Sequence, residues 1–117
     1  MKKSIFGFAL FLLLTVSSFA QVQDFTLING CDFVISYVYI SPSSETNWGE
    51  DVLTVDVLGS GEECEIEFSG HEECLWDIKA VADDGSEAVW TGIDLCEYFS
   101  IKLTMTEEGP YAVFDAE

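Results

Sequence analysis

The sequence predicts an all-β fold, a small antiparallel β-sandwich that is immunoglobulin-like or similar, with about six to seven strands and two disulfides. Short runs rich in β-branched and aromatic residues recur along the chain, and Gly, Pro and Ser turns separate them. No stretch carries the apolar period of a long amphipathic helix. The 9 Phe, 4 Tyr and 3 Trp supply enough apolar surface for a core.

Residues 1–20 have the features of a signal peptide rather than of a folded element. Two lysines precede an apolar run over residues 5–16, and Ser18-Phe19-Ala20 carries small residues where a signal peptidase cuts. We expect cleavage before Gln21 and a single β-sandwich domain over residues 21–117. The expected location is secreted or periplasmic. After cleavage we expect no membrane contact, because no later run approaches the roughly 20 apolar residues of a membrane helix.

Strands are expected where apolar residues alternate or cluster between turn signals. The expected strands cover residues 24–29, 33–41, 63–68, 74–82, 87–92 and 99–105. Residues 52–58 are ambiguous between a short strand and a helical turn. The tail over residues 106–117 is either an edge strand at Tyr111 to Phe114 or loose. Asp84-Gly85 is the strongest turn signal and predicts a hairpin between two of these strands.

Four cysteines in an exported domain allow three disulfide pairings. The predicted hairpin limits the choice, since a two-residue turn sets Cys74 opposite Leu95 and a three-residue bulged turn sets it opposite Cys96. Either register brings Cys74 and Cys96 together, so we predict that they pair. Elimination leaves Cys31 with Cys64. Both have the inward parity of their strands, which is compatible with a bridge between the sheets.

Catalytic and zinc sites have little support in the sequence. His71-x-x-Cys74 has a zinc-like spacing, but two disulfides account for every cysteine. The single histidine, His71, lies near Ser69 and several acids, which leaves a small hydrolase as an alternative. No Cys-x-x-Cys, Gly-x-Ser-x-Gly, glycine-rich phosphate loop or His-Glu-x-x-His motif occurs. We therefore expect the protein not to be an enzyme.

The chain is strongly acidic, with 22 Asp and Glu against 4 Lys, no Arg and a formal net charge of −18. Two of the lysines leave with the signal peptide, so Lys79 and Lys102 remain. Such a chain repels nucleic acids and anionic lipids, which bind through Lys and Arg. It attracts metal cations and basic proteins, although an acidic coat also keeps an exported domain soluble. The oligomeric state is left open.

The stretch from Tyr39 to Leu53 is too polar for a core and too aromatic for an ordinary linker. The candidate binding surface within it consists of Trp48, Gly49, Glu50 and Asp51. An exposed Trp beside carboxylates suits a basic protein or a cation-bridged ligand. In the structural alternative, Trp48 plugs one end of the core while Asn47 and Asp51 cap turns or the start of a helix.

The same stretch carries oxygen donors of the kind that calcium prefers. The candidate ligands are Glu45, Asn47, Glu50 and Asp51. Their spacing does not match an EF-hand, and so acidic a chain forms such clusters by chance. We therefore expect no cofactor, with a calcium-binding or calcium-stabilised β domain as the alternative.

Several blocks of the chain together resemble a family of small secreted or periplasmic bacterial proteins. The most specific block runs from Tyr39 through Ser41-Pro42-Ser43-Ser44 to Trp48-Gly49-Glu50-Asp51 and Leu53. The weaker blocks are Asp24-Phe25-Thr26-Leu27-x-Asn29, Cys74-x-x-Asp77-Ile78, Asp84-Gly85, Trp90-x-Gly92 and Leu95-Cys96. The similarity covers nearly all of the chain after the signal peptide, up to about Met105.

The resemblance agrees with a disulfide between Cys74 and Cys96, and it makes Cys31 and Cys64 an addition in this sequence. Asp32, where the family tends to have glycine, and the tail after Met105 also depart from the pattern. The resemblance implies no particular activity. Some members carry an argininosuccinate-lyase label, but this chain lacks arginine and is far too short for that large helical enzyme. The expected role is non-enzymatic binding or interaction.

Overall fold

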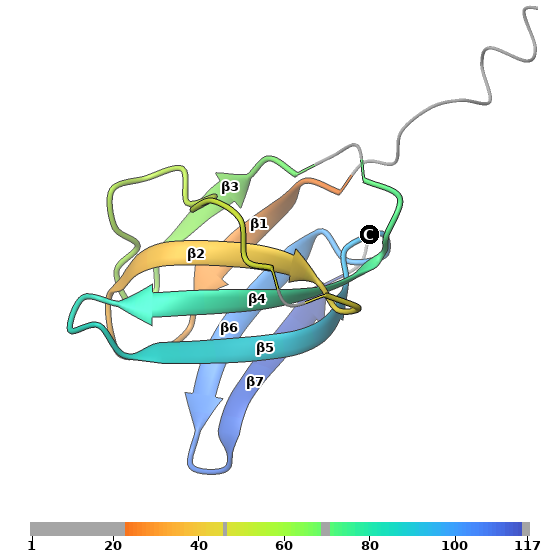
Figure 1. Cartoon of the computed structure of the whole chain (residues 1–117). Coiled ribbons are helices and arrows are strands. Elements are labelled where there is room, and N and C mark those ends of the chain that lie inside the picture. The colour runs from red at the N-terminus through yellow and green to blue at the C-terminus, as the bar shows by residue number, and fades with distance from the viewer. Residues whose placement is uncertain (1–22, 46, 69–70, 116–117) are drawn as a thin grey trace, which may run out of the picture.

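The computed structural model describes residues 23–45, 47–68 and 71–115, and they form seven strands in two packed sheets (Figure 1). The strands are β1 (Phe25–Asn29), β2 (Ile35–Pro42), β3 (Glu63–Ile66), β4 (Leu75–Ala82), β5 (Glu87–Asp94), β6 (Ser100–Thr106) and β7 (Gly109–Asp115). These residues contain no helix that is long and apolar enough to cross a membrane. The predicted all-β class is confirmed, while the predicted signal peptide lies outside the described residues.

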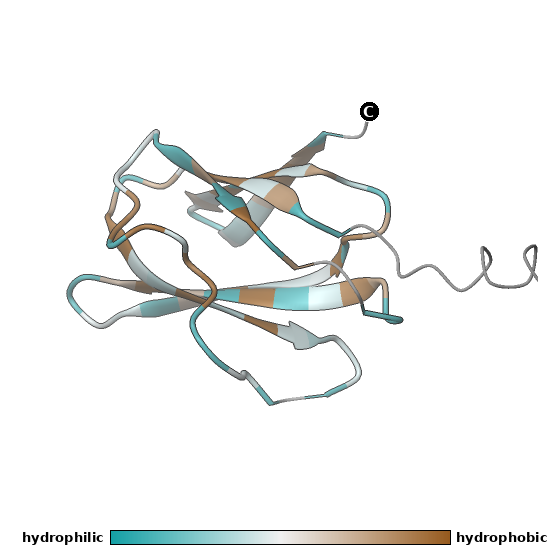
Figure 2. Cartoon of the chain, turned by 90° about the horizontal axis from the view of Figure 1, so that it is seen from above, coloured by the Kyte–Doolittle hydropathy of each residue, from teal (hydrophilic) through white to brown (hydrophobic). Residues whose placement is uncertain are grey.

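One sheet has the strand order β3-β1-β6-β7 and the other has the order β2-β4-β5. Figure 2 shows them as two layers. β1 pairs with β6 in parallel, and the other strand pairs are antiparallel. The prediction of a purely antiparallel sandwich is therefore wrong for this one pair. Parallel pairing is possible here because the chain between β1 and β6 passes through the other sheet, which supplies the long crossover that parallel strands need.

The core lies between the sheets because every second residue of the strands that flank it is apolar. In β4 the buried residues are Trp76, Ile78, Ala80 and Ala82, and the residues between them are partly exposed. β1 and β6 supply the facing side with Phe25, Leu27, Ile101 and Leu103, each at most 1% exposed. This alternation assigns Tyr37, Tyr39 and Lys79 to the outer face of the β2-β4-β5 sheet.

Two stretches that the sequence left open are settled by the strand pairing. The tail forms a full edge strand, since β7 pairs with β6 from Ser100 and Asp115 to Thr106 and Gly109. Residues 52–58 form neither a strand nor a helix, and within them only Leu58 makes an isolated bridge, to Ile35.

Cys74 and Cys96 form a disulfide, as predicted. The β4–β5 hairpin turns over residues 83–85, since Ala82 N–H donates to Ser86 O at 2.8 Å. At its open end Leu95 N–H donates to Cys74 O at 2.8 Å, which brings the two cysteines together.

The predicted disulfide between Cys31 and Cys64 is wrong, because both are free cysteines. Cys64 lies opposite Leu27 in the β1–β3 pair, within one sheet. Cys31 follows Leu27 by four positions and lies in the bend after the end of β1, and four residues of extended chain would span about 13 Å. A disulfide needs Cα atoms within about 7 Å of each other. Shared parity therefore did not imply proximity.

We expect the two free thiols to react at different rates with a maleimide at pH 8. The Cys31 side chain is buried and its Sγ lies 3.5 Å from Leu103 O, whereas Cys64 is partly exposed. Burial, with a smaller contribution from Asp32, raises the pKa of the Cys31 thiol above its ordinary value of 9.0. Peptide mass spectrometry of the native protein should show Cys64 labelled well before Cys31. Equal labelling rates would contradict this burial.

The raised pKa of Cys31 also has a consequence for stability. The fold favours the neutral thiol. The contribution of Cys31 to the free energy of unfolding is therefore fully present below the ordinary pKa of the thiol, and it is lost as the pH rises through the pKa of Cys31 in the folded protein. Denaturant melts should therefore show a loss of stability as the pH rises above the thiol's ordinary pKa of 9.0, and this loss should be smaller in Cys31→Ala. An unchanged pH dependence in that variant would assign the loss to other groups.

Candidate functional site

The central stretch belongs to the loop between β2 and β3, and Asp51 fastens that loop to β2. Asp51 Oδ1 accepts hydrogen bonds from Val38 N–H at 2.9 Å and from Leu53 N–H at 3.1 Å. Beside it, Val52 N–H donates to Val38 O at 2.8 Å. The partly buried side chains of Val52 and Leu53 pack against the core. Asp51 thus has the turn-capping role of the structural alternative.

Replacing Asp51 with alanine should destabilise the fold by about 1–3 kcal/mol, because two backbone donors lose a charged acceptor. Glu50→Ala is the matched control, since Glu50 is the exposed acid next in sequence and should change stability within about 0.5 kcal/mol. Urea melts of the two variants measure the difference. Equal midpoints would contradict the fastening role of Asp51.

A second aspartate joins three elements at the far end of β2. Asp77 Oδ1 accepts from Ser43 Oγ at 2.7 Å and from Gly92 N–H at 3.0 Å. Thr91 and Gly92 together face Asp77, which makes a β-bulge in β5, and Gly92 takes a φ of +67° that suits glycine. Three residues of the resemblance blocks are therefore explained by a structural contact.

Trp48 lies over the outer face of the β2-β4-β5 sheet rather than in the core. Its side chain is half-buried, and Lys79 Nζ lies 5.1 Å from the centroid of its ring. Lys79 stands between the inward-facing Ile78 and Ala80, so its own side chain points outward. Gly49, with a φ of +52°, supplies the turn that follows Trp48.

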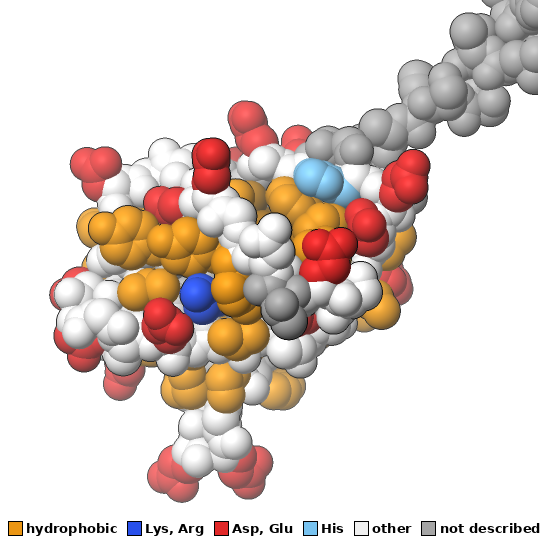
Figure 3. All heavy atoms as spheres, in the orientation of Figure 1, with side chains coloured by type: hydrophobic (Ala, Val, Ile, Leu, Met, Phe, Trp, Pro, Cys, Tyr) orange, Lys and Arg blue, Asp and Glu red, His pale blue; other side chains and the backbone are white. Residues whose placement is uncertain are grey.

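Tyr37, Tyr39, Trp48 and Lys79 form one surface, which we call the aromatic face. Lys79 Nζ lies 5.2 Å from the Tyr39 ring centroid and 4.0 Å from a carboxylate oxygen of Glu87. Tyr37 stacks beside Tyr39 at 6.3 Å between centroids, and 49% of its surface is exposed. In the space-filling view, hydrophobic side chains gather over β2 and β4 and acidic side chains surround them (Figure 3).

A shallow depression of about 410 Å³ adjoins the aromatic face at Tyr37. Its lining includes the carboxylates of Asp51 and Asp56 and the exposed side chains of Val55 and Val57. The depression therefore combines an aromatic ring, two acids and apolar surface, a combination that suits a long cationic side chain.

The predicted calcium ligands are not gathered in the described residues. Glu45, Asn47 and Glu50 are exposed, and Asp51 Oδ1 is occupied by backbone donors. Within residues 23–45, 47–68 and 71–115, one group of three His, Cys, Asp or Glu side chains brings its potential metal-ligand atoms within 4.8 Å of one another. It consists of Cys74, Asp94 and Cys96. Two of these are the disulfide sulfurs, which do not act as thiolate ligands. Calcium binding stays a prediction without a specific observation to favour it.

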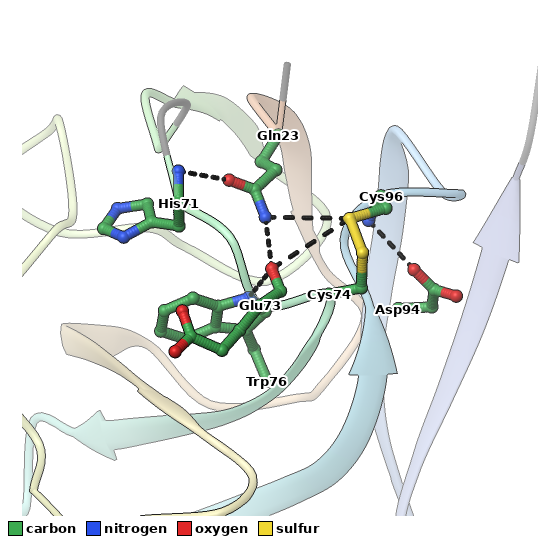
Figure 4. Close-up of a disulfide and its surroundings, with 7 residues drawn as sticks. All are labelled: Gln23, His71, Glu73, Cys74, Trp76, Asp94 and Cys96. Carbon is green, nitrogen blue, oxygen red and sulfur yellow. Dashed lines mark hydrogen bonds between the residues drawn. A yellow bond between two sulfur atoms is a disulfide. The ribbon is translucent and has the colours of Figure 1, made fainter. Parts of the chain in front are cut away.

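The surroundings of His71 are aromatic and structural. The His71 ring stacks on Phe68 at 4.3 Å and lies 5.1 Å from the Trp76 ring, and the backbone N–H of His71 donates to Gln23 Oε1 at 2.9 Å. Figure 4 shows His71, Gln23 and Trp76 beside the disulfide. The disulfide of Cys74 removes the thiolate that the zinc alternative needed. Ser69, which the hydrolase alternative needed, lies outside the described residues.

The comparisons with known proteins bear on the fold alone. No family model and no curated protein matches the chain. An NMR structure of a protein from Eubacterium rectale is similar, with a TM-score of 0.54 and 14% identity, over 83% of this chain and 91% of that chain. The family resemblance suggested by the sequence blocks stays a prediction.

The sequence predicted Trp48 and Asp51 as candidate site residues, but it did not predict the residues that surround them in the structure. Tyr37, Lys79 and Asp56 lie in other segments, and only the strand register brings Tyr39 opposite Lys79. The β-bulge at Gly92 did have a sequence signal, because an isolated glycine inside a strand often marks one.

Proposed function

We propose that this chain is an exported, non-enzymatic binding module whose aromatic face takes up cationic side chains of a basic protein. The observation that carries the proposal is the position of Lys79, whose ammonium lies 5.2 Å from the Tyr39 ring and 5.1 Å from the Trp48 ring. A cation over an aromatic ring gains about 0.5–1 kcal/mol at exposed sites and more where it is desolvated. The face thus already accommodates one cation from within the chain.

Tyr37 offers the next ring on the same face to a cation from a partner. It is exposed, it stacks beside Tyr39, and the acids Asp51 and Asp56 line the adjoining depression. Arginine suits this setting better than lysine, since its planar guanidinium stacks on rings and pairs with carboxylates through parallel hydrogen bonds. The acidic surface of the whole chain attracts a basic partner and speeds the encounter.

Titration with N-acetyl-arginine methylamide, followed by NMR, tests the proposal. A single capped arginine supplies the cation without an extended backbone, so weak saturable binding is expected, with shifts centred on the Tyr37 ring and the amides of residues 51–57. Tyr37→Leu should weaken binding severalfold, while Phe99→Leu, at an exposed aromatic residue outside the depression, should leave it unchanged.

The acids are tested with a matched pair of charge removals. Asp56→Asn should weaken arginine binding, whereas Glu97→Gln, at an exposed acid outside the depression, should not. Two results would refute the site: chemical-shift changes spread evenly over the acidic surface, or arginine binding by Tyr37→Leu that equals binding by the wild type. Either would show that the ligand is attracted by net charge alone.

A further inference from the structure

The sandwich has two sides at which edge strands of the two sheets lie, and among the described residues only one of them is bridged by a loop. On the side of β2 and β3, the loop between these strands forms hydrogen bonds with both of these edge strands. Ile35 and Leu58 exchange two backbone hydrogen bonds of 2.9 Å, and Thr54 Oγ1 donates to Glu65 O at 2.8 Å. The opposite side, where the edge strands β5 and β7 meet, instead has an open groove of about 480 Å³. Its lining includes Val89, Trp90 and Ile93 of β5 and Tyr111, Ala112 and Phe114 of β7.

The strand register shows which backbone groups of β7 face away from its sheet. Phe99 O accepts from Thr26 N–H of β1 at 2.9 Å, and Leu103 O accepts from the N–H of Gly30, the residue that follows β1, at 2.7 Å. Because alternate residues of a strand direct their backbone groups to opposite sides, Lys102 and Thr104 face β7. Their partners there are Val113 and Tyr111. Ala112 and Phe114, which alternate with these two residues, therefore direct their backbone groups outward, at an edge where no other described strand pairs with β7.

Side chains that line the groove are already fixed by contacts within the protein. Trp90 is only 3% exposed, and its indole N–H donates to Tyr111 O at 3.0 Å and to Thr104 O at 3.2 Å. Phe114 stacks on Tyr98 at 4.5 Å between centroids. A ligand would therefore find ordered apolar walls and would lose little affinity to side-chain ordering.

The charges around this edge decide what can pair with it. Glu107 and Glu108 occupy the turn before β7, and Asp115 ends the strand. A second copy that paired in antiparallel fashion would bring its glutamates onto Asp115, and parallel pairing would bring Asp115 onto Asp115. Like charges at these positions repel. A strand with basic residues at both ends instead meets acids at both ends.

We propose that the free edge of β7 binds an extended segment of a partner protein with basic residues at both ends, which adds to the β3-β1-β6-β7 sheet as a further strand. Ala112 and Phe114 supply the backbone hydrogen bonds, and every second side chain of the segment enters the groove between β7 and β5. Main-chain pairing supplies affinity in this mode of recognition, and side chains in pockets supply specificity. Pro110 lacks an N–H, so pairing is confined to the part of β7 that follows it.

The test uses the oxidised, 15N-labelled protein and the peptide Lys-Lys-Val-Thr-Val-Thr-Val-Lys-Lys, with glutamate in place of lysine in a control peptide. The lysine peptide should shift the Ala112 and Phe114 amides saturably and should slow their hydrogen exchange. The glutamate peptide should bind at least tenfold more weakly. Undisturbed amides at these two residues, or equal binding of both peptides, would overturn the proposal. So would peptide-independent protection of these amides that grows with protein concentration, which would indicate a second copy at the edge.

Variants separate edge pairing from general attraction. Ala112→Pro removes an outward donor at a place where edge strands tolerate proline, and it should weaken peptide binding at least tenfold. Pro110→Ala, the reverse change two residues away, should keep binding or strengthen it. Asp115→Asn combined with Glu108→Gln leaves the backbone unchanged and should weaken binding with a shallower salt dependence. Undiminished binding by Ala112→Pro, or by the charge variant, would refute the assignment.

Discussion

Replacing both Cys74 and Cys96 with alanine should lower the free energy of unfolding by about 2–5 kcal/mol, the usual effect of losing a native disulfide from a small domain. The bond closes the open end of the β4–β5 hairpin and joins residues 22 positions apart. The first described residue depends on the same place, since Gln23 Nε2 donates to Glu73 O at 2.6 Å and lies 3.8 Å from Cys96 Sγ (Figure 4). Losing the bond should therefore also loosen the chain before β1.

Thermal melts of the oxidised protein and the double variant measure this effect, at about 4–8 °C for each kcal/mol in a domain of this size. Cys64→Ala is the matched control, because it removes a cysteine that forms no disulfide. It should cost much less, and a reducing agent should lower the melting temperature of Cys64→Ala but not that of the double variant. Equal melting temperatures for all three proteins would contradict a stabilising role of the bond.

Trp90→Ala should destabilise the fold by about 3–5 kcal/mol, the range for deleting a large buried aromatic side chain. Trp90 is 3% exposed, extends from β5 toward the other sheet and donates to carbonyls of both β6 and β7. The variant loses its packing and leaves Thr104 O and Tyr111 O without that donor. We expect the β6–β7 hairpin to exchange amide hydrogens faster than β1 and β4 do.

Trp90→Phe separates the packing contribution from the hydrogen bonds. It keeps a ring in the core but removes the indole N–H, so a smaller loss of about 1–2 kcal/mol is expected. Urea melts with hydrogen exchange read out both variants. If Trp90→Phe matched the wild type in stability and in exchange of the β6–β7 amides, the donor would have no bridging role.

The sequence predicted the all-β class and most strands because alternation and turn residues are local signals. The hairpin at Asp84-Gly85 and the disulfide of Cys74 with Cys96 are short-range features of the same kind. The parallel pairing of β1 with β6 and the separation of Cys31 from Cys64 depend on which distant strands become neighbours. Periodicity assigns a face to a residue, but it does not assign a partner.

The same limit explains what could be predicted of the site. Several residues of the resemblance blocks prove to be structural, as Asn29 illustrates. Its buried side-chain amide donates to Phe33 O at 2.8 Å and to Leu58 O at 2.9 Å, and its Oδ1 accepts from Cys31 N–H. Asp51 has a comparable role at β2. The predicted site residues are polar residues in turn-rich stretches, where capping and ligand binding leave similar patterns.

The most direct test of the aromatic face is the chemical shift of the Lys79 side-chain methylene protons. If Tyr39 and Trp48 hold the ammonium of Lys79 as described, ring currents should move these protons upfield of their position in an unstructured peptide, and Trp48→Ala should return them part of the way. Lys102, which is exposed on the other sheet, serves as the internal reference and should show unstructured values. Unshifted Lys79 protons that ignore the Trp48 substitution would contradict the account, because the face would then hold no cation.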